Sequence, residues 1–414
     1  MQDPLRIGMF TTFYPPYNFG GDGIGVNRLA TALARVGCDV TVVHDRDAYV
    51  SLAGKEPAPS PADPRVKTVA LRRQGLISPL LTQQLGRPAL KKSELEAVMR
   101  DGAFDVLWYH NVSLIGGPLL LAMGDAVKIY EAHEHWLVCP THVLWRDNHE
   151  LCDERRCVRC QLTYSRPPQI WRHTGLLERN LHHVDRFIAK SAFSKAKHAA
   201  FGFAPDMTVV PYFLPDLAQD DSPPYQPEKP YLLFVGRLEK IKGLQDVIPA
   251  FAGSEGPDLV IVGSGTYEGA LRALAAGMPR VKFVGAVPSD RVSAYYRGAE
   301  ALIVPSVCYE TFGIILIEAF RLGTPVLARN IGPFPEIAGK GGGLLFKDSE
   351  ELVSLVSRLD EDRELRERLR LDARQSFEKY WREDVVIAQY LDVVRDAAEA
   401  RGDERVLTKL RGLQ

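Results

Sequence analysis

The chain lacks long apolar runs and has no excess of charge of either sign. Its longest apolar runs, such as PLLLAM, fall far short of a membrane span, and the start, MQDPLRIGMFTTFYPP, has no apolar core long enough for a signal peptide. Lys and Arg number 51 against 52 Asp and Glu, a balance that argues against bulk nucleic-acid binding. We therefore expect a cytoplasmic protein with no nucleic-acid partner.

Cysteine is also scarce, with six in 414 residues, yet four of these lie within 139–160. Their spacing is C-x12-C-x4-C-x2-C, and a final C-x2-C pair is typical of thiolate metal sites. We expect a structural Zn²⁺, with His142 and His149 as substitute ligands. Redox or free thiols and an iron–sulfur cluster are alternatives, and a reducing cytoplasm weakens the disulfide alternative. The expected metal ligands are Cys139, Cys152, Cys157 and Cys160.

Apolar, β-rich runs alternate with helical patterns along both halves of the chain. This βα rhythm predicts parallel sheets, and 414 residues are too many for one ordinary core. We therefore expect two Rossmann-like, doubly wound α/β domains. Strands are expected at RIGMFTTF, CDVTVVH, FDVLWYH, AVKIYEAH and RFIAKS, and then at YLLFVG, DLVIVG, VKFVG, ALIVPS and TPVLAR.

The domain boundaries follow from a break in this rhythm near residue 215. The stretch LPDLAQDDSPPYQPEKP is rich in Pro and Asp, a composition that is typical of a linker between domains. The last helical segment contains Trp381 and the apolar VVIAQYLDVV, so we expect it to cross back to the N-terminal domain. The expected parts are an N-terminal domain at 1–215 with a cysteine-rich insertion at 136–165, a linker at 216–230, a C-terminal domain at 231–380 and C-terminal helices at 381–414.

Ligands of two facing doubly wound domains bind at the carboxyl ends of the strands. After the first strand, FGGDGIGVNR could bring backbone close to an anion, with Gly21 giving the close approach. The alternative is a tight turn, because Val26 breaks the G-x-G-x-x-G fingerprint. His133 ends the strand in VKIYEAH, and His110 holds the same position with less support; a structural histidine is the alternative for both.

The second half carries the more specific motifs. In LLFVGRLEKIKG, Arg237 and Lys242 follow a strand and could reach one anion, unless this is a solvated basic turn. In CYETFGIILIEAFRLGTPV, Glu310 follows the strand ALIVPS and a helix is expected to begin at Phe312–Gly313, with its first amides free to bind an anion or a sugar oxygen. Glu318 lies in the apolar IILIEAF, where a carboxylate is costly without a donor such as a sugar hydroxyl. A capping or solvent-facing Glu is the alternative.

Together these motifs resemble the retaining glycosyltransferases of family 4, the glycosyl transferases group 1, which have the GT-B fold. The resemblance rests on G-G after the first strand, V-G-R-L…K-G, and E-x-F-G…E-A…G-T-P-V…G-P-F-P-E, and it spans nearly the whole chain. Gly332-Pro333 departs from the family's frequent Gly-Gly, and 136–165 looks like an insertion.

The resemblance implies a UDP- or GDP-sugar donor and a glycan, lipid-linked or small-molecule acceptor. It implies that Arg237 and Lys242 neutralise the diphosphate, Glu318 binds the ribose, and Glu310 holds the donor sugar. Domain closure would exclude water, the acceptor would attack from the front face, and no cofactor would serve catalysis. The amides near Phe312, Gly313 and Ile314 would assist Glu310, His133 would meet the sugar or its phosphate, and Gly21 would approach the diphosphate or acceptor.

Alternative functions explain less of the sequence than a glycosyltransferase does. An NAD(P)-dependent oxidoreductase would use LVIVGSG, but Glu268 stands at the last position of the fingerprint. A metal-binding module without transferase activity would leave both domains unexplained. Asp45-Arg46-Asp47 matches a metal-binding DxD of another glycosyltransferase fold. The basic and apolar residues of 72–92 are compatible with peripheral contact with the inner face of a membrane, and a solvated loop and helix explains them equally well.

Overall fold

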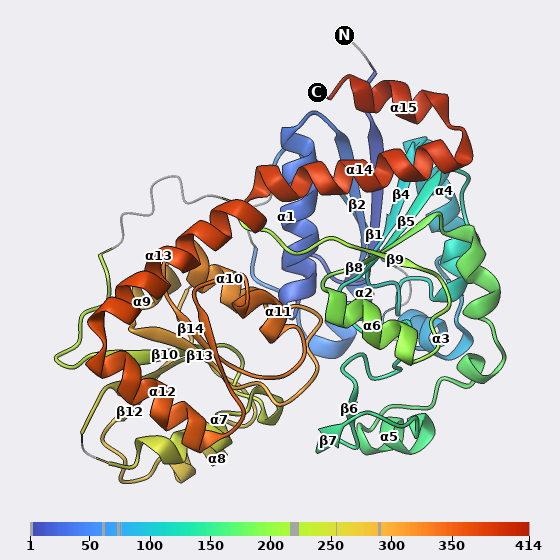
Figure 1. Cartoon of the computed structure of the whole chain (residues 1–414). Coiled ribbons are helices and arrows are strands. Elements are labelled where there is room, and N and C mark those ends of the chain that lie inside the picture. Colours follow the sequence, from blue (N-terminus) through green and yellow to red (C-terminus); the bar gives the residue numbers. More distant parts are fainter. Residues whose placement is uncertain are drawn as a thin grey trace. The chain divides into compact units, whose positions relative to one another are not determined.

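The computed structural model describes residues 3–59, 63–72, 75, 77–215, 223–253, 255–288 and 291–413. The chain forms two compact units, each with its own parallel sheet (Figure 1). Unit 1 comprises Met1–Pro211 and Val386–Gln414, and unit 2 comprises Tyr212–Val385.

Unit 1 is built on a seven-stranded sheet with the order β3-β2-β1-β4-β5-β8-β9. All pairings are parallel, and Ile7 lies opposite Val40 on one side and Val106 on the other. The order reverses between β1 and β4, which is the usual ligand-binding position in such sheets. The strands are β1 (Arg6–Thr11), β2 (Asp39–Asp45), β3 (Val66–Leu71), β4 (Val106–Tyr109), β5 (Val127–Ala132), β8 (Arg186–Ala189) and β9 (Met207–Val209).

Helices cover the faces of this sheet, and the last long one, α14, runs across it (Figure 1). The ring of Tyr390 on α14 lies 5.6 Å from that of Trp108 on β4, so the end of the chain contributes to this core. The helices are α1 (Gly21–Arg35), α2 (Arg46–Ala53), α3 (Ile77–Leu85), α4 (Lys92–Gly102), α5 (Cys157–Thr163), α6 (Ala192–Ala200), α14 (Glu383–Arg401) and α15 (Glu404–Arg411), with 3-10 turns η1 (Pro118–Ala122), η2 (Ile170–His173) and η3 (Glu178–His183) and a short antiparallel ribbon of β6 (Trp145–Arg146) and β7 (Glu150–Leu151).

Unit 2 is built on a six-stranded parallel sheet with the order β12-β11-β10-β13-β14-β15. Leu233 lies opposite Val260 and Leu302, and apolar clusters pack on both faces, as expected for a sheet covered on both sides. The strands are β10 (Tyr231–Val235), β11 (Asp258–Val262), β12 (Val281–Gly285), β13 (Ala301–Val304), β14 (Val326–Arg329) and β15 (Gly343–Phe346).

The helices of unit 2 follow its strands in chain order. Most are short, whereas α12 and α13 near the end of the unit have 13 and 18 residues. They are η4 (Lys240–Lys242), α7 (Leu244–Val247), η5 (Ile248–Phe251), α8 (Glu268–Leu274), α9 (Val292–Gly298), α10 (Ile314–Arg321), α11 (Phe334–Ala338), α12 (Ser349–Glu361) and α13 (Arg363–Tyr380).

The expected fold class is confirmed, since both units are parallel α/β sheets and every strand named from the sequence is present. Strands β3, β9 and β15, and the two short strands β6 and β7, were not expected. Strand β3 lies at a sheet edge and exposes Lys67 and Thr68, so it lacks the continuous apolar run that marks the central strands.

The observed division of the chain differs from the expected one by a few residues at each crossing. Of the expected linker, 216–222 lies outside the described residues, whereas Tyr225 packs in unit 2: its N–H donates to the Ala294 carbonyl at 2.9 Å and its ring stacks on Tyr295. Trp381 packs 5.7 Å from Phe320 in the core of unit 2, so the chain joins unit 1 only from Val386.

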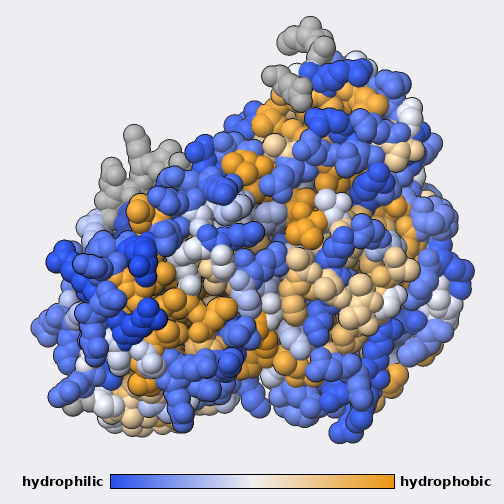
Figure 2. Space-filling model, viewed as in Figure 1, coloured by the Kyte–Doolittle hydropathy of each residue, from blue (hydrophilic) through white to orange (hydrophobic). Residues whose placement is uncertain are grey.

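Among the described residues, no helix combines the length and apolar character needed to cross a bilayer. The face of the molecule in Figure 2 is mostly hydrophilic, with smaller hydrophobic areas between.

Candidate functional site

Unit 2 brings a lysine and a glutamate together at the carboxyl ends of two neighbouring strands. Lys242 lies on η4 after β10, and Glu310 lies after β13. The Lys242 ammonium donates to Glu310 Oε1 at 2.7 Å, and the Ser306 hydroxyl donates to the same oxygen at 2.9 Å. Both charged side chains are about one-fifth exposed, so the pair is largely sheltered from water while remaining accessible.

Each member of this pair keeps the other charged. Burial opposes the charge on Lys242, but the Glu310 carboxylate outweighs it and raises the pKa of Lys242. Burial likewise opposes the charge on Glu310, and Lys242 outweighs it, with help from Ser306 and Arg237, so the pKa of Glu310 is lowered. The structure therefore holds a fixed positive and a fixed negative charge side by side.

Arg237 completes a group of three charged residues after β10 and β13. Its side chain is 61% exposed and pairs with Glu239 at 2.7 Å, on the same turn. Its charge acts on both Lys242 and Glu310, which places it near the pair. The two expected cations thus converge, and the Arg237 side chain is open to a ligand.

Helix α10 begins at Ile314, just after the expected start at Phe312–Gly313 and four residues after Glu310. Gly313 is the residue before the helix, with a φ of 99°, and a Cβ there would come within 2.6 Å of Phe334. Phe312 is buried with its ring 5.6 Å from Tyr212, so its side chain is not available to a ligand. Ile314 is the first helical residue, and the amides of this first turn point along the helix axis toward its start.

Glu318 lies on α10 among buried apolar residues and is itself half-buried. Its Oε2 atom accepts a hydrogen bond of 3.2 Å from the Tyr296 hydroxyl. We expected a hydrogen-bond donor for this carboxylate, and the Tyr296 hydroxyl of the protein itself is one such donor.

In unit 1, His133 lies in a buried cluster with His110 and Glu131. The His110 Nδ1 and His133 Nε2 atoms are 2.9 Å apart, and Glu131 Oε1 lies 3.6 Å from the same His133 nitrogen. The side chains of all three are at most 1% exposed. Both histidines expected from strand ends are therefore brought together, inside the unit rather than on its surface.

The cluster extends through Lys190 at the end of β8 and Tyr390 on α14. Lys190 forms an ion pair with Glu131, and the Tyr390 hydroxyl donates to Glu131 Oε1 at 2.8 Å. Burial alone raises the pKa of Glu131, but Lys190, His133 and His110 outweigh it and hold the pKa at about 2. Among the described residues, only His110, Glu131 and His133 place three metal-ligating atoms within 4.8 Å of one another, but the Lys190 ammonium already occupies the carboxylate.

Burial determines the charge state of these histidines. It lowers the pKa of His110 to about 4 and that of His133 well below its ordinary value. Both rings are therefore neutral at pH 7, and His133 would serve a ligand as a neutral hydrogen-bonding group.

The glycine-rich stretch after β1 starts α1 rather than forming a long loop. Gly21 is the first residue of α1, and a Cβ there would meet nothing within 4 Å. Gly23 is more constrained, because a Cβ would come within 2.4 Å of the Asn18 side chain and 2.9 Å of the Phe13 carbonyl. Gly23 is therefore the tightly packed glycine, whereas there is open space beside the Cα atom of Gly21.

Two motifs that supported rival interpretations have structural explanations. Asp45 caps α2 by accepting from the Ala48 N–H at 3.0 Å and pairs with the fully buried Lys91, so the DxD serves the fold. A Cβ at Gly263 would approach the Gly236 carbonyl to 1.9 Å, and one at Gly265 would approach the Leu238 carbonyl to 2.4 Å. These glycines allow two neighbouring turns to pack closely, which needs no dinucleotide.

The four cysteines of 139–160 lie in one neighbourhood of unit 1, and all six cysteines are free of disulfides. Burial, with smaller contributions from the other three thiols, raises the pKa of Cys152 to about 12. Within the described chain no three of the sulfurs lie within 4.8 Å of one another. The structure therefore brings the four expected cysteine ligands into one region, but their sulfur atoms are farther apart than in a metal-bound site.

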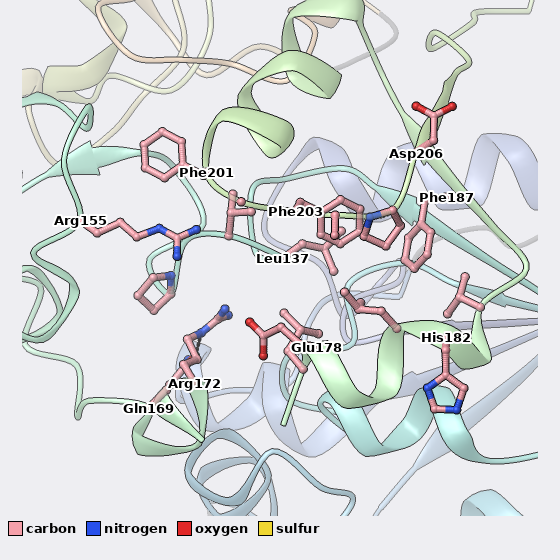
Figure 3. A pocket seen from close by; sticks show the side chains of 18 of the residues that line it. Leu137, Arg155, Gln169, Arg172, Glu178, His182, Phe187, Phe201, Phe203 and Asp206 are labelled. Carbon is pink, nitrogen blue, oxygen red and sulfur yellow. Dashed lines mark hydrogen bonds between the residues drawn. The ribbon is translucent and has the colours of Figure 1, made fainter. Parts of the chain in front are cut away.

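A cavity of about 840 Å³, seen from close by in Figure 3, has one of these four cysteines in its lining. Phe187, Phe201 and Phe203 give it an apolar wall, and Arg155 and Arg172 extend into it together with Glu178. Cys157 is part of its lining, whereas none of the other expected site residues is.

Sequence reasoning missed several members of these clusters. Glu131 and Lys190 could have been found, because a charged residue inside the apolar strands VKIYEAH and RFIAKS needs a partner. Tyr390 gave no signal, since it lies 259 residues from Glu131. Ser306 and Tyr296 also gave none.

Two family profiles match this chain. Residues 19–215 match the profile of Glycosyltransferase Family 4, and residues 218–376 match that of Glycosyl transferases group 1. The two matches follow one another along most of the sequence.

Curated relatives match at moderate identity, some over only part of their length. The sulfoquinovosyl transferase SQD2 of Arabidopsis thaliana is 35% identical over 38% of this chain and 32% of its own, so the match spans about a third of that relative. A phosphatidylinositol monomannoside mannosyltransferase of Mycobacterium tuberculosis is 30% identical over 42% of this chain and 49% of its own. The glycogen synthase of Mycobacterium tuberculosis is 26% identical over 81% of both chains.

Solved structures share the fold over nearly the whole chain. Sucrose-phosphate synthase of Thermosynechococcus elongatus has a TM-score of 0.73 at 19% identity and covers 95% of this chain and 99% of its own. Anabaena HepE, solved with UDP and glucose, has a TM-score of 0.64 at 15% identity and covers 94% of this chain and 99% of its own. With the family profiles, these likenesses establish that the chain belongs to the family 4, group 1 glycosyltransferases and has their GT-B fold.

Proposed function

We propose that this chain is a retaining glycosyltransferase that moves a hexosyl or hexosaminyl group from a nucleotide-diphosphate sugar to an acceptor. The observation that carries the proposal is the sheltered Lys242–Glu310 pair, with Arg237 close by and the start of α10 beside it. This arrangement offers two cations to a diphosphate and a carboxylate with backbone amides to a sugar.

Arg237 and Lys242 bind the diphosphate, which is also the leaving group. Breaking the bond between the sugar and the phosphate places additional negative charge on the phosphate. Cations that are already aimed at it therefore stabilise the transition state more than the ground state. Arg237 is open to a forked contact with phosphate oxygens, and Lys242 acts as a point charge held in place by Glu310.

Glu310 and the first turn of α10 bind the donor sugar. Glu310 accepts hydrogen bonds from sugar hydroxyls through the oxygen lone pairs that are not already used by Lys242 and Ser306. The backbone amides near Phe312, Gly313 and Ile314 donate to sugar or phosphate oxygens. Glu318 accepts the ribose hydroxyls, with Tyr296 fixing its orientation.

The reaction proceeds with front-face attack and without a catalytic metal. The acceptor hydroxyl attacks the anomeric carbon on the face from which the phosphate leaves, and its proton passes to the departing phosphate oxygen. We assign Glu310 to binding the donor sugar and not to nucleophilic attack; its Oε1 atom accepts from Lys242 and Ser306. The cations of Arg237 and Lys242 supply the charge neutralisation that a metal would otherwise give.

Unit 1 contributes His133 and Gly21. The His133 ring is neutral, and the cluster of Glu131, Lys190 and Tyr390 holds it after β5 with its side chain about 1% exposed. Its proposed contact with the sugar or its phosphate therefore requires the ring to become accessible when the donor binds. The space at Gly21, at the start of α1, admits a diphosphate or acceptor oxygen close to the backbone.

Named relatives support a UDP- or GDP-sugar donor and a sugar or lipid-linked acceptor. HepE is described in complex with UDP and glucose, and a mannosyltransferase relative is described as GDP-mannose-dependent with a phosphatidylinositol monomannoside acceptor. Helix α3 adds support for peripheral contact with the inner face of a membrane from the cytoplasm, because Ile77, Leu80 and Leu85 are 56%, 52% and 41% exposed. Basic residues Arg87 and Lys92 follow this helix.

A donor screen tests the proposal. The protein is incubated with UDP- and GDP-sugars without acceptor, and nucleotide release and thermal stabilisation are measured, with NAD(P)H as a comparison. We expect one base to stabilise the protein and to be released, with unchanged rates after brief EDTA treatment. Stabilisation by NAD(P)H and by no nucleotide-sugar would overturn the proposal. Once an acceptor is found, inversion of the anomeric centre in the product, seen by NMR, would overturn the retaining assignment.

A further inference from the structure

The four cysteines of 139–160 come from three separate pieces of the insertion. Cys139 follows the turn after β5, where its N–H donates to the His135 carbonyl at 2.7 Å. Cys152 follows β7, and Cys157 and Cys160 lie three residues apart on α5, which places both side chains on one helix face. Cys139 and Cys160 are buried and the other two are half-buried, as ligands of an enclosed site would be.

Direct contacts tie these cysteines together. The Thr141 hydroxyl lies 3.3 Å from Cys139 Sγ and also hydrogen-bonds the Cys160 thiol. The backbone N–H of Asp147 donates to Cys160 Sγ at 3.4 Å. A backbone N–H directed at sulfur stabilises a thiolate more than a neutral thiol, because the acceptor is then charged.

The surroundings carry positive charge that suits a tetrathiolate. Arg146 lies near Cys152, and Arg155 and Arg172 lie near Cys157. Arg172 is the most sheltered of these: it donates to the Trp136 carbonyl at 2.8 Å, stacks on the Trp171 ring and interacts electrostatically with Cys139 and Cys157. Four thiolates around a divalent ion carry a net charge of about −2, which these guanidinium groups balance.

The insertion has little structure of its own to hold this shape. Its regular elements are two two-residue strands and one seven-residue helix. Four residues without the freedom of glycine have positive φ values in the same turn region: His142, Leu144, Asp147 and Asn148. A bound metal would hold a segment with this much irregular backbone in one conformation.

We propose that Cys139, Cys152, Cys157 and Cys160 bind one structural Zn²⁺ as four thiolates. Zn–S bonds of about 2.3 Å set the sulfurs about 3.8 Å apart. Since no three sulfurs in the described chain lie within 4.8 Å of one another, binding draws them together, and the four thiols release their protons to solvent.

The metal also fixes one wall of the 840 Å³ cavity. Arg155, Cys157 and Gln161 on and before α5 line that cavity. Arg172 extends into the cavity (Figure 3) and also interacts electrostatically with Cys139 and Cys157. The proposal rests on the cysteine cluster alone and is independent of the transferase reaction.

Metal content and thiol accessibility of the full chain test the proposal. We expect about one zinc per chain by mass spectrometry of the elements, released by a mercurial and detected with a zinc dye. The double variant C157S/C160S should lose this zinc. C38A, which changes a buried cysteine elsewhere in unit 1, should keep it.

A second measurement, on the wild-type protein, tests the zinc site even if the double variant fails to fold. Stripping the wild-type protein with a chelator should lower its melting temperature, and adding Zn²⁺ alone should restore it. A metal-free protein with four readily titrated thiols in this segment, a coloured iron-containing protein, or a melting temperature indifferent to zinc would each overturn the proposal.

Discussion

The hydroxyl of Tyr390 donates a 2.8 Å hydrogen bond to Glu131 Oε1 and so joins α14 to β5 in unit 1. The same carboxylate pairs with Lys190 and lies 3.6 Å from His133, all with side chains almost completely buried. The end of the chain therefore takes part in positioning His133.

The first prediction is that Tyr390→Phe lowers the free energy of unfolding by about 1–2 kcal/mol, because Glu131 loses a buried donor while the ring packing on Trp108 remains. If the cluster positions His133, kcat should also fall while KM for the donor changes little. Tyr109→Phe is a matched control, since that buried tyrosine donates only at 3.3 Å to a backbone carbonyl outside the cluster. Denaturant unfolding and steady-state kinetics measure both. Equal effects of the two variants on kcat would count against the positioning role.

The second prediction concerns Lys242. Lys242→Ala should lower kcat about 100- to 1,000-fold, because it removes a cation from the leaving group. Lys240→Ala changes an exposed lysine on the same short turn and should leave kcat nearly unchanged. Circular dichroism shows whether each variant is folded. Turnover by Lys242→Ala within a few-fold of the wild type would remove Lys242 from the site.

The third prediction separates nucleotide binding from turnover. Glu318→Ala should weaken nucleotide binding by about 10- to 100-fold, the cost of losing hydrogen bonds to a charged acceptor. Tyr296→Phe keeps the carboxylate and removes only its 3.2 Å hydrogen bond, so a smaller loss is expected. Calorimetric titration with the nucleotide diphosphate gives both values. An unchanged Kd for Glu318→Ala would exclude a ribose contact.

The fourth prediction concerns helix α3. The triple variant I77S/L80S/L85S should lose binding to anionic lipid vesicles, because it removes three exposed apolar side chains from one short helix. Leu52→Ser changes an equally exposed leucine on α2 and should bind as the wild type does. Co-sedimentation at low and moderate salt measures the binding. Absence of vesicle binding by the wild-type protein would remove the membrane proposal.

Local sequence patterns predicted most of this fold. They could not predict which side chains far apart in the sequence would contact one another. The strand ends predicted that Arg237 and Lys242 lie after one strand and Glu310 after another. The structure adds that these two strands are neighbours, which brings the three side chains to one edge of the sheet. The sequence did not show that the carboxylate of Glu318 meets Tyr296, or that Asp45 caps a helix and pairs with Lys91. These depend on which side chains the fold brings together, and no local pattern records that.

The last prediction is a loss of stability in mild acid. Burial lowers the pKa of His44 from 6.5 to about 4, so between these values the unfolded chain takes up a proton that the folded chain does not. The free energy of unfolding should therefore fall as pH is lowered from 6.5 to 4, by up to about 3 kcal/mol from this residue. His44→Phe should flatten that part of the profile, since the ring still packs beside Tyr14 and Tyr17. Denaturant unfolding at several pH values measures it, with the exposed His173→Gln as control. A pH profile unchanged by His44→Phe would show that His44 does not contribute.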